Sequence, residues 1–449
     1  MSSRYPTRKF NRRIMLGASI TSLTLPVVAR DDGRPMVTRP RATDGDDRSE
    51  PDWDEYLTVT VGNRGANING NDDRAIQAAV DYIGRIGRGT VQLQPGVFKL
   101  RNSIFLPSNL RLRGMGDDTI ITKHASHEAI IREDSDWYDQ EITLKAGHGF
   151  RVGDAVFITA KSNANGSMEH IKRTIIARKG DRFKLNDGLR KNVWLAGNPK
   201  ATSVFPLLTS EYSADVVIEN LTLDGNRKNN VNMNGNYGGC IFLQDCNRYT
   251  MRGVTTRNYN GDGISFQICH DVLVEDCKSY GNADLGVHPG SGSQRPLIRN
   301  NQLHDNSIGI FWCWGVRYGL AEKNHIKNNS SYGISIGHCD TDNIMKDNDV
   351  IDSGRVGILF RDDARGKDFW ANRNLIMNNR ITNSGDNTGV GIRLDGQTKD
   401  TRVVGNVITE KRGQAERIGI QVNAEVGNVR LENNLIDGVR TKIVDNREQ

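Results

Sequence analysis

Three copies of one short motif decide the fold: Gly309-Ile310-Phe311-Trp312, Gly333-Ile334-Ser335-Ile336 and Gly357-Ile358-Leu359-Phe360. Further copies begin at Gly263, Gly286, Gly391 and Gly419. From the first copy to the last, the steps are 23, 23, 24, 24, 34 and 28 residues. A repeat of this length is typical of a solenoid, in which each turn buries its apolar face against its neighbours. Apolar and variable residues alternate after each glycine, so the repeating unit is a half-buried strand.

A second motif, Asn followed by any residue and then an aliphatic one, recurs in the same repeats. It begins at Asn301, Asn324, Asn348, Asn379, Asn406 and Asn434. Asparagine tolerates the left-handed backbone of a tight corner, and stacked asparagines can hydrogen-bond one another along the solenoid axis. Helical repeats are the alternative, but windows rich in Asn and Gly and poor in Ala and Leu oppose helix formation. The sequence therefore predicts an all-β solenoid of parallel strands, wound once per repeat.

The segment 71–98 comes before the repeats and predicts a helix followed by a strand. Asp72 or Asn71 can cap a helix that Gly84 to Gly89 ends. The apolar face of that helix consists of Ile76, Ala79, Val80 and Ile83. With the repeats, this segment resembles the right-handed parallel β-helix proteins of the pectate-lyase-like superfamily, over about residues 56–446. The resemblance implies a single-stranded right-handed parallel β-helix with an N-terminal capping helix. It points to the polysaccharide lyase and uronate epimerase branch, on a scaffold that also carries hydrolases and adhesins.

The remaining segments complete a domain plan. Arg12-Arg13 precedes a short apolar stretch and the small residues Val27-Val28-Ala29, which resembles a twin-arginine export signal. The stretch is too short and too rich in Ser and Thr to predict a stable membrane anchor. The plan is a signal peptide (1–29), a disordered linker (30–55), the cap and first coils (56–137), a small β-rich insertion (138–205) and the parallel β-helix coils (206–449).

Charge and cysteine usage limit the classes of partner. The formal net charge is +6, but residues 1–29 contain five Lys and Arg and no acid, so the rest carries about +1. No concentrated basic stripe remains, and a nucleic-acid partner is not expected. Cys246 and Cys269 occupy equivalent positions in successive repeats, where stacked buried thiols are expected. The six cysteines do not have the spacing of a disulfide framework or a zinc site. The sequence leaves open whether the chain forms a homo-oligomer.

Stacking places one strand position above itself in every coil, about 4.8 Å apart, so sequence-distant residues form columns. The first outward column contains Ser265, His288, Phe311, Ser335, Leu359, Arg393 and Gln421. The second contains Gln267, Gly290, Cys313, Gly337, Arg361, Asp395 and Asn423. Adjoining loops and turns add Trp314, His338, Asp340, Asp342, Asp362, Asp363, Asp262, Asp284, His304 and Asp305. Because His, Asp, Arg and Trp replace the usual Lys and Glu, we interpret this face as a groove for a sugar chain.

The segment 284–293 is the sharpest local feature of the groove. Pro289 interrupts a repeating strand directly after His288, and glycines and serines follow. It is loosely similar to the Asp-Pro-His-Asp signature of uronate epimerases and alginate lyases, but here the proline follows the histidine. Asp284, four residues earlier, is the acid expected to orient His288.

These residues predict an exported protein that acts on a uronic-acid-containing polysaccharide by β-elimination or C5 proton abstraction. The catalytic candidates are His288 or His338 as base, Asp284, and Arg361, or alternatively Arg393, to neutralise the substrate carboxylate. The substrate-binding candidates are Trp314, Arg393, Asp395, Gln267 and Asp362. One alternative is a hydrolase with a pair among Asp284, Asp340, Asp362 and Asp395; another is a non-catalytic binding or surface solenoid. Asp340 and Asp342 are candidate Ca²⁺ ligands, but turn bonding is favoured, so no metal site is assigned.

Overall fold

The computed structural model describes residues 53–413 and 416–448. The chain divides into two units, residues 1–56 and 57–449, and the account below concerns the second. The expected signal peptide and nearly all of the expected linker lie outside the described residues. Within the described part, no helix combines the length and the apolarity needed to cross a membrane.

The expected capping helix is present as α1 (Asp73–Ile86). The Asp72 carboxylate accepts a hydrogen bond from the backbone N–H of Ala75 at 3.1 Å, as an N-cap residue does. Gly87 ends the helix in the left-handed conformation, at φ 109°. The apolar face predicted from the sequence, together with Ala75, is buried against the first coils.

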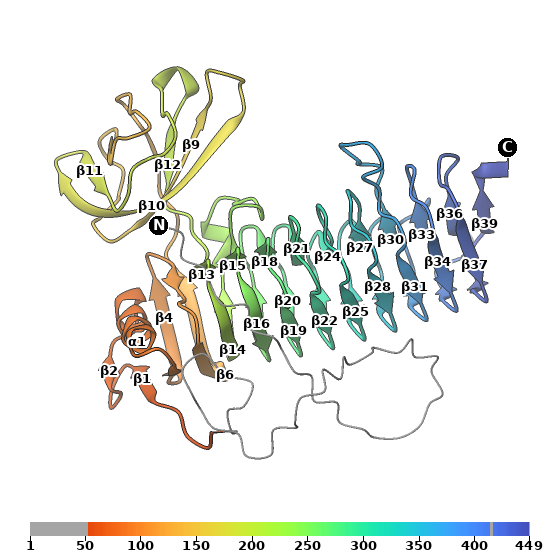
Figure 1. The fold of residues 1–449 in the computed structure, drawn as a ribbon, viewed down its shortest axis with the longest axis horizontal. Coiled ribbons are helices and arrows are strands. Elements are labelled where there is room, and N and C mark those ends of the chain that lie inside the picture. Colours follow the sequence, from red (N-terminus) through yellow and green to blue (C-terminus); the bar gives the residue numbers. More distant parts are fainter. Residues whose placement is uncertain (1–52, 414–415, 449) are drawn as a thin grey trace, which may run out of the picture. The chain divides into compact units, whose positions relative to one another are not determined.

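Residues 57–448 confirm the right-handed parallel β-helix, in which each regular coil contributes three strands to two long parallel sheets (Figure 1). The 11-stranded sheet comprises β5 (Ile104–Phe105), β13 (Leu208–Glu211), β15 (Gly239–Gln244), β18 (Asp262–Gln267), β21 (Leu285–Gly290), β24 (Ile308–Phe311), β27 (Tyr332–Ile336), β30 (Val356–Phe360), β33 (Val390–Leu394), β36 (Ile418–Val422) and β39 (Thr441–Asp445).

The 22-stranded sheet holds the other two strands of each regular coil. It comprises β1 (Thr58–Gly62), β2 (Ile68–Asn69), β3 (Gly89–Leu93), β4 (Gly96–Leu100), β6 (Leu110–Lys123), β14 (Ala214–Asp224), β16 (Asn247–Arg252), β17 (Thr255–Arg257), β19 (Leu273–Glu275), β20 (Lys278–Tyr280), β22 (Leu297–Arg299), β23 (Gln302–His304), β25 (Leu320–Glu322), β26 (His325–Lys327), β28 (Ile344–Lys346), β29 (Asp349–Ile351), β31 (Leu375–Met377), β32 (Arg380–Thr382), β34 (Thr401–Val404), β35 (Val407–Thr409), β37 (Val429–Glu432) and β38 (Leu435–Asp437). Short 3-10 turns occur at Leu195–Gly197, Arg227–Asn229 and Asn446–Glu448.

Two apolar ladders fill the interior behind the 11-stranded sheet. The first stacks in register through Ile264, Val287, Ile310, Ile334, Ile358, Ile392 and Ile420, all fully buried. The second contains Phe266, Trp312, Ile336, Phe360, Leu394 and Val422, also fully buried. Burial of each such side chain contributes about 1.5 to 3 kcal/mol, so the repeated motif supplies the main stabilising core.

The asparagine ladder lies at the corner between the two strands that each coil gives to the 22-stranded sheet. The side-chain amide of each ladder asparagine donates to the Oδ1 of the next, at 2.9 to 3.0 Å from Asn301 to Asn434. The expectation that these asparagines take the left-handed conformation is wrong. The preceding residue takes it, as Asn300, Lys323 and Asp347 show with φ of 54 to 56°. That kink turns each ladder side chain inward, where it meets its neighbours.

The β-rich insertion is a separate six-stranded sheet with its own core. Its strands are β7 (Glu128–Ile130), β8 (Glu141–Thr143), β9 (Ala155–Lys161), β10 (Met168–Lys179), β11 (Arg182–Leu185) and β12 (Lys200–Thr202). The first strand therefore begins before residue 138, the boundary expected from the sequence. Arg101 of the first coils holds the insertion through Asp154, with Nε 2.5 Å from Oδ1.

The six cysteines all lie in described coils, and none forms a disulfide. Cys246 and Cys269 stack in successive coils, where the backbone N–H of Cys246 lies 3.4 Å from the Cys269 Sγ. This is the packing role expected for them.

Candidate functional site

The outer face of the 11-stranded sheet brings a histidine and a buried carboxylate together. His288 of β21 pairs in register with Ser265 of β18. The Nδ1 of His288 lies 2.7 Å from Oδ2 of Asp262, the first residue of β18, and both side chains are buried. Burial raises the pKa of Asp262, although the hydrogen bond from His288 acts in the opposite direction. A carboxylate at Nδ1 selects the tautomer that carries the proton there, so Nε2 is the unprotonated nitrogen of neutral His288.

Asp284 does not orient His288, contrary to the expectation from the sequence. Its Oδ2 instead accepts a hydrogen bond from the side-chain amide of Asn232 at 3.0 Å. Four residues along an extended strand span about 13 Å, whereas adjacent coils are about 4.8 Å apart. The carboxylate that reaches the histidine therefore comes from the preceding coil.

The loop 230–238 covers this pair. The Ser265 hydroxyl donates to the carbonyl of Gly235 at 2.7 Å. Gly235 packs so tightly on the Asp262 carboxylate that a Cβ at this position would lie 1.7 Å from Oδ2. His288 Nε2 and Gln267 Oε1 are buried and have no hydrogen-bond partner among the described residues. Two unsatisfied polar atoms on neighbouring strands are unusual in a folded interior and indicate a site.

Phe311 connects His288 to Arg361 along the same face. The rings of Phe311 and His288 meet edge to face, with centroids 5.3 Å apart, and the Arg361 guanidinium lies 4.3 Å from the Phe311 centroid. All three guanidinium nitrogens are engaged. They donate to Asp363 at 3.0 Å, to Ser335 at 2.9 Å and to the carbonyl of Trp312 at 3.1 Å. Arg361 thus spans several coils and brings positive charge close to His288.

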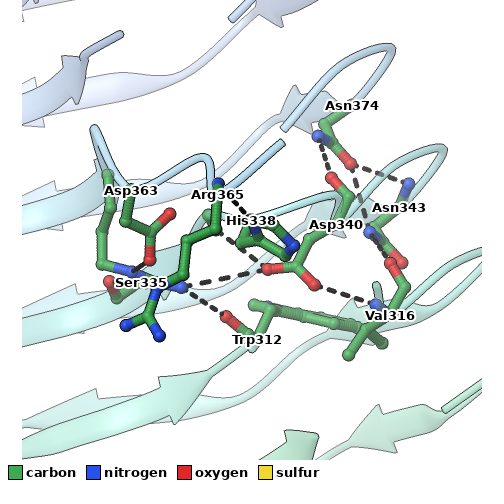
Figure 2. A network of polar contacts seen from close by, with 11 residues as sticks. Trp312, Val316, Ser335, His338, Asp340, Asn343, Asp363, Arg365 and Asn374 are labelled. Carbon is green, nitrogen blue, oxygen red and sulfur yellow. Dashed lines mark hydrogen bonds and ion pairs between the residues drawn. The ribbon is translucent and has the colours of Figure 1, made fainter. Parts of the chain in front are cut away.

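Asp340 lies at the centre of the polar network in Figure 2. It is fully buried, and its carboxylate accepts hydrogen bonds from the backbone N–H groups of Val316 at 2.8 Å and Gly337 at 2.9 Å. Burial raises its pKa to about 6, although Arg361 opposes the shift. These contacts give Asp340 a structural role.

The two acids considered as Ca²⁺ ligands do not converge. Asp342 pairs with Arg373 through two hydrogen bonds of 2.8 Å, while both oxygens of Asp340 face the backbone. Among the described residues, no three His, Cys, Asp or Glu side chains gather into a group that could hold a metal ion.

Trp314 belongs to an exposed cluster of rings and cations further along the same side. Its side chain is 37% exposed, and the Arg365 guanidinium lies 4.3 Å from the centroid of its ring. His338, which is itself buried, packs against Trp314 with ring centroids 4.8 Å apart and edge-on against Phe369 with centroids 5.4 Å apart. The Nδ1 of His338 accepts a hydrogen bond from the backbone N–H of Arg365 at 2.9 Å, so neutral His338 presents a proton at Nε2 (Figure 2).

Arg365 and Phe369 were not predicted from the sequence. Both lie in the extra length of the 34-residue step from Gly357 to Gly391. Additional residues within one repeat of a solenoid form a loop on one face, which is often the binding face. The long step was therefore the signal that could have identified them.

The remaining binding candidates lie at the two ends of this face. Arg393 donates to Asp395 at 2.9 Å, and both line a pocket of about 550 Å³ with Tyr332, Arg355 and Asp386. Burial raises the pKa of Asp395, and the charge of nearby Asp362 adds to the shift. Gln267 lies at the opposite end beside Ser265, to which it donates at 3.1 Å.

Comparison with known proteins supports the fold. Residues 209–369 match a family model described as a right handed beta helix region. The A-module of the mannuronan C-5 epimerase AlgE4 from Azotobacter vinelandii has 15% identity and a TM-score of 0.50, over 86% of this chain and 97% of that one. The surface adhesin PfbA of Streptococcus pneumoniae has 14% identity and a TM-score of 0.52, over 86% and 93%. The Dettilon tailspike protein has 14% identity and a TM-score of 0.52, over 87% and 63%. No curated protein matches the sequence. At these identities the likeness shows the fold alone.

Proposed function

We propose that this chain is an exported carbohydrate-active protein that removes the C5 proton of a uronic acid residue in an anionic polysaccharide. The observation that carries the proposal is the pairing of Asp262 with His288. The carboxylate holds the Nδ1 proton and leaves Nε2 as a proton acceptor, as a general base requires. The mannuronan epimerase that shares the fold acts on a uronic acid polymer, which is compatible with this chemistry.

The neighbouring cations supply the second requirement of C5 proton abstraction. Removing that proton builds negative charge on the substrate carboxylate, which positive charge nearby stabilises. Arg361 lies across Phe311 from His288, although its nitrogens already have protein partners. Arg361 would therefore stabilise the developing negative charge through its fixed positive charge, without a direct hydrogen bond to the substrate.

Arg365 and His338 lie where further sugar units of the same polymer would bind. The strands β21 and β27 are two coils apart, so His338 lies about 10 Å further along the axis than His288. Arg365 can pair with a carboxylate there while Trp314 and Phe369 pack against sugar rings.

Burial of His288 favours a second candidate, a solenoid that binds polysaccharide without turnover. His288 Nε2 is buried, and the loop 230–238 and Phe311 pack around the pair of Asp262 and His288, so a substrate reaches Nε2 only when part of this cover moves. The exposed cluster around Trp314 needs no such movement. The acid-pair hydrolase is less well supported, because Asp340 is bonded to the backbone and Asp284 to Asn232.

One experiment separates these functions. The purified protein is incubated in heavy water with a panel of anionic polysaccharides, and the products are followed by ultraviolet absorbance, reducing-end assay and NMR. Unsaturated products identify a lyase, and deuterium at C5 without cleavage identifies an epimerase. New reducing ends without absorbance identify a hydrolase. Binding without any product would reject proton abstraction in favour of the binding solenoid.

Export is tested separately, because Arg12 and Arg13 lie outside the described residues. A twin-arginine pair is an address read by a receptor, so charge alone does not replace it. Changing both residues to lysine is expected to retain the precursor in the cytoplasm, as fractionation and immunoblotting would show. Undiminished export of the double variant would reject the assignment.

A further inference from the structure

A cleft of about 800 Å³ lies where the insertion meets the first coils, apart from the site described above. The strand β10 of the insertion lines one side. The strands β13 and β15 and the loop 230–238 contribute to the other. A volume of this size is typical of sites for small organic ligands. Nothing in the repeated motif predicts it, because the insertion lies outside the repeat.

The cleft is built by contacts that cross from the insertion to the solenoid. Lys172 of β10 extends over the ring of Phe242 of β15, with Nζ 4.4 Å from the centroid. The same Nζ lies 3.4 Å from Oε1 of Glu211 of β13. These contacts fix the two walls of the cleft relative to each other.

Aromatic rings line the cleft on both walls. His170 stacks on Tyr237 with centroids 3.9 Å apart and an interplanar angle of 19°. Phe157 stacks behind His170 at 5.6 Å. Phe105 of β5 presents a ring that is 50% exposed. Flat apolar surfaces beside polar groups suit a ligand that has both C–H faces and hydroxyl groups.

The charges of the lining argue against an anionic ligand. Asp81, Asp187 and Glu211 contribute carboxylates, while Lys172 and Arg173 are the only cations of the lining. Lys172 is already paired with Glu211, and Arg173 donates to the carbonyls of Gly188 and Leu189. Burial lowers the pKa of His170, which keeps its ring neutral. A carboxylate entering the cleft would meet more carboxylates than cations, and both cations of the lining already have protein partners.

We propose that this cleft is a binding site for uncharged sugar residues. Their C–H faces pack against Phe105 and Tyr237, and their hydroxyls donate to the carboxylates of the lining. Tyr237 and Asn236 line the cleft, while Gly235 of the same loop lies on Ser265 and Asp262. The loop 230–238 thus contacts both the cleft and the residues around His288. The site does not depend on proton transfer at His288.

The full-length protein is tested by calorimetric titration with size-defined neutral gluco-, manno- and galacto-oligosaccharides and with uronic acid oligosaccharides. Wild type is expected to bind at least one neutral series. Phe105→Ala should weaken that binding about tenfold, because it removes an exposed apolar platform. Tyr212→Ala is the matched control: its ring is 71% exposed, adjoins Glu211 and does not line the cleft. It should bind as wild type does.

A second pair of variants separates this site from the anionic groove. Arg365→Ala should weaken the binding of uronic acid oligosaccharides and leave the binding of neutral ones unchanged. Phe105→Ala should weaken the binding of neutral oligosaccharides and leave the binding of uronic acid oligosaccharides unchanged. Failure of every neutral oligosaccharide to bind wild type would overturn the cleft proposal and leave the groove proposal standing. Equal neutral-sugar affinity of Phe105→Ala and wild type would also overturn it.

Discussion

The two sheets of the solenoid enclose one core but present different outer faces. On the 22-stranded sheet, outward charges pair between neighbouring coils. Arg252 of β16 and Arg299 of β22 both donate to Glu275 of β19, at 2.9 and 2.6 Å. On the 11-stranded sheet, His288 and Gln267 are buried with a polar atom that has no partner among the described residues. The outward charges of the 22-stranded sheet are thus paired, whereas the candidate site on the other sheet holds a buried imidazole and a buried amide, each with an unpaired atom.

Asp340 and Asp342 lie two residues apart and differ in how deeply they are buried. Burial raises the pKa of Asp340 to about 6. The hydrogen bonds from Arg373 lower the pKa of Asp342, which lies near the surface at the start of the other sheet. One carboxylate is held in the interior at an energetic cost, and the other is stabilised by an ordinary ion pair.

The largest expected effect follows from replacing His288 with Asn. The Asn amide can still donate to Asp262 in place of Nδ1, but it cannot replace Nε2. Loss of a general base costs about 10²- to 10⁴-fold in rate, so turnover should fall by that factor with the fold retained. The measurement is kcat on the polysaccharide that the panel identifies, with circular dichroism as the check on folding. Retention of full activity by this variant would show that the buried histidine is only structural.

Replacing Asn348 with Ala should give the largest loss of stability outside the apolar core. Its Oδ1 accepts from the backbone and the side chain of Asn324, and its own amide donates to Ala321 and Asn379. Removal leaves several buried groups unsatisfied, at about 1 to 3 kcal/mol each before relaxation. A loss of about 2 to 4 kcal/mol is expected in urea denaturation, with turnover of the folded fraction unchanged. A loss below 1 kcal/mol would show that buried water can replace the ladder.

The fold was predictable because its determinants repeat. A glycine and an aliphatic residue every 23 or 24 positions are sufficient to place Ile264, Val287 and Ile310 in one ladder, whatever lies between them. The Asn ladder follows for the same reason. The asparagine prediction failed only on the corner conformation. The repeat shows where the corner lies, but it does not show that the residue before each asparagine takes the left-handed φ.

For the candidate site, the sequence predicted only which outward strand positions stack above one another from coil to coil. Stacking placed His288 over Ser265, and Asp262 was visible as the residue before a motif glycine. The choice of Asp284 failed because residues four positions apart along a strand are further from each other than residues that stack in adjacent coils. The loop 230–238, which covers the pair of Asp262 and His288, and the cleft of the insertion were not predictable, because no repeat constrains their geometry.

The two aspartates allow the contrast to be tested through pH. Between about pH 4 and 6 the folded chain keeps the Asp340 proton that the unfolded chain has lost, so this group makes stability fall as pH rises. For Asp340, a pKa raised from 3.8 to about 6 corresponds to on the order of 3 kcal/mol. Asp340→Asn should therefore flatten the stability profile over this window, even if its baseline is lower. Denaturant titrations from pH 4 to 7 would measure it.

Asp342→Asn is the matched control for that profile. Because the folded-state pKa of Asp342 is lowered, its contribution is present above the unfolded pKa and is lost as pH falls. The asparagine variant should therefore lose stability near neutral pH and converge on wild type in acid. Parallel profiles for the two variants would contradict the opposite environments assigned to these carboxylates.

The smallest effect is expected from Arg380→Ala on the 22-stranded sheet. Arg380 of β32 donates to Asp349 of β29 at 2.6 and 2.7 Å, but its side chain is 72% exposed. An exposed pair contributes between about 0 and 1 kcal/mol, because solvent screens the attraction and two long side chains lose freedom. The variant should lose no more than this in urea denaturation at low salt, and less at about 1 M salt, where the screening length is roughly 3 Å. Turnover and neutral-sugar binding should equal those of wild type. A loss of turnover at this position would mean that the 22-stranded sheet also contributes to the site, and the contrast between the two faces would no longer hold.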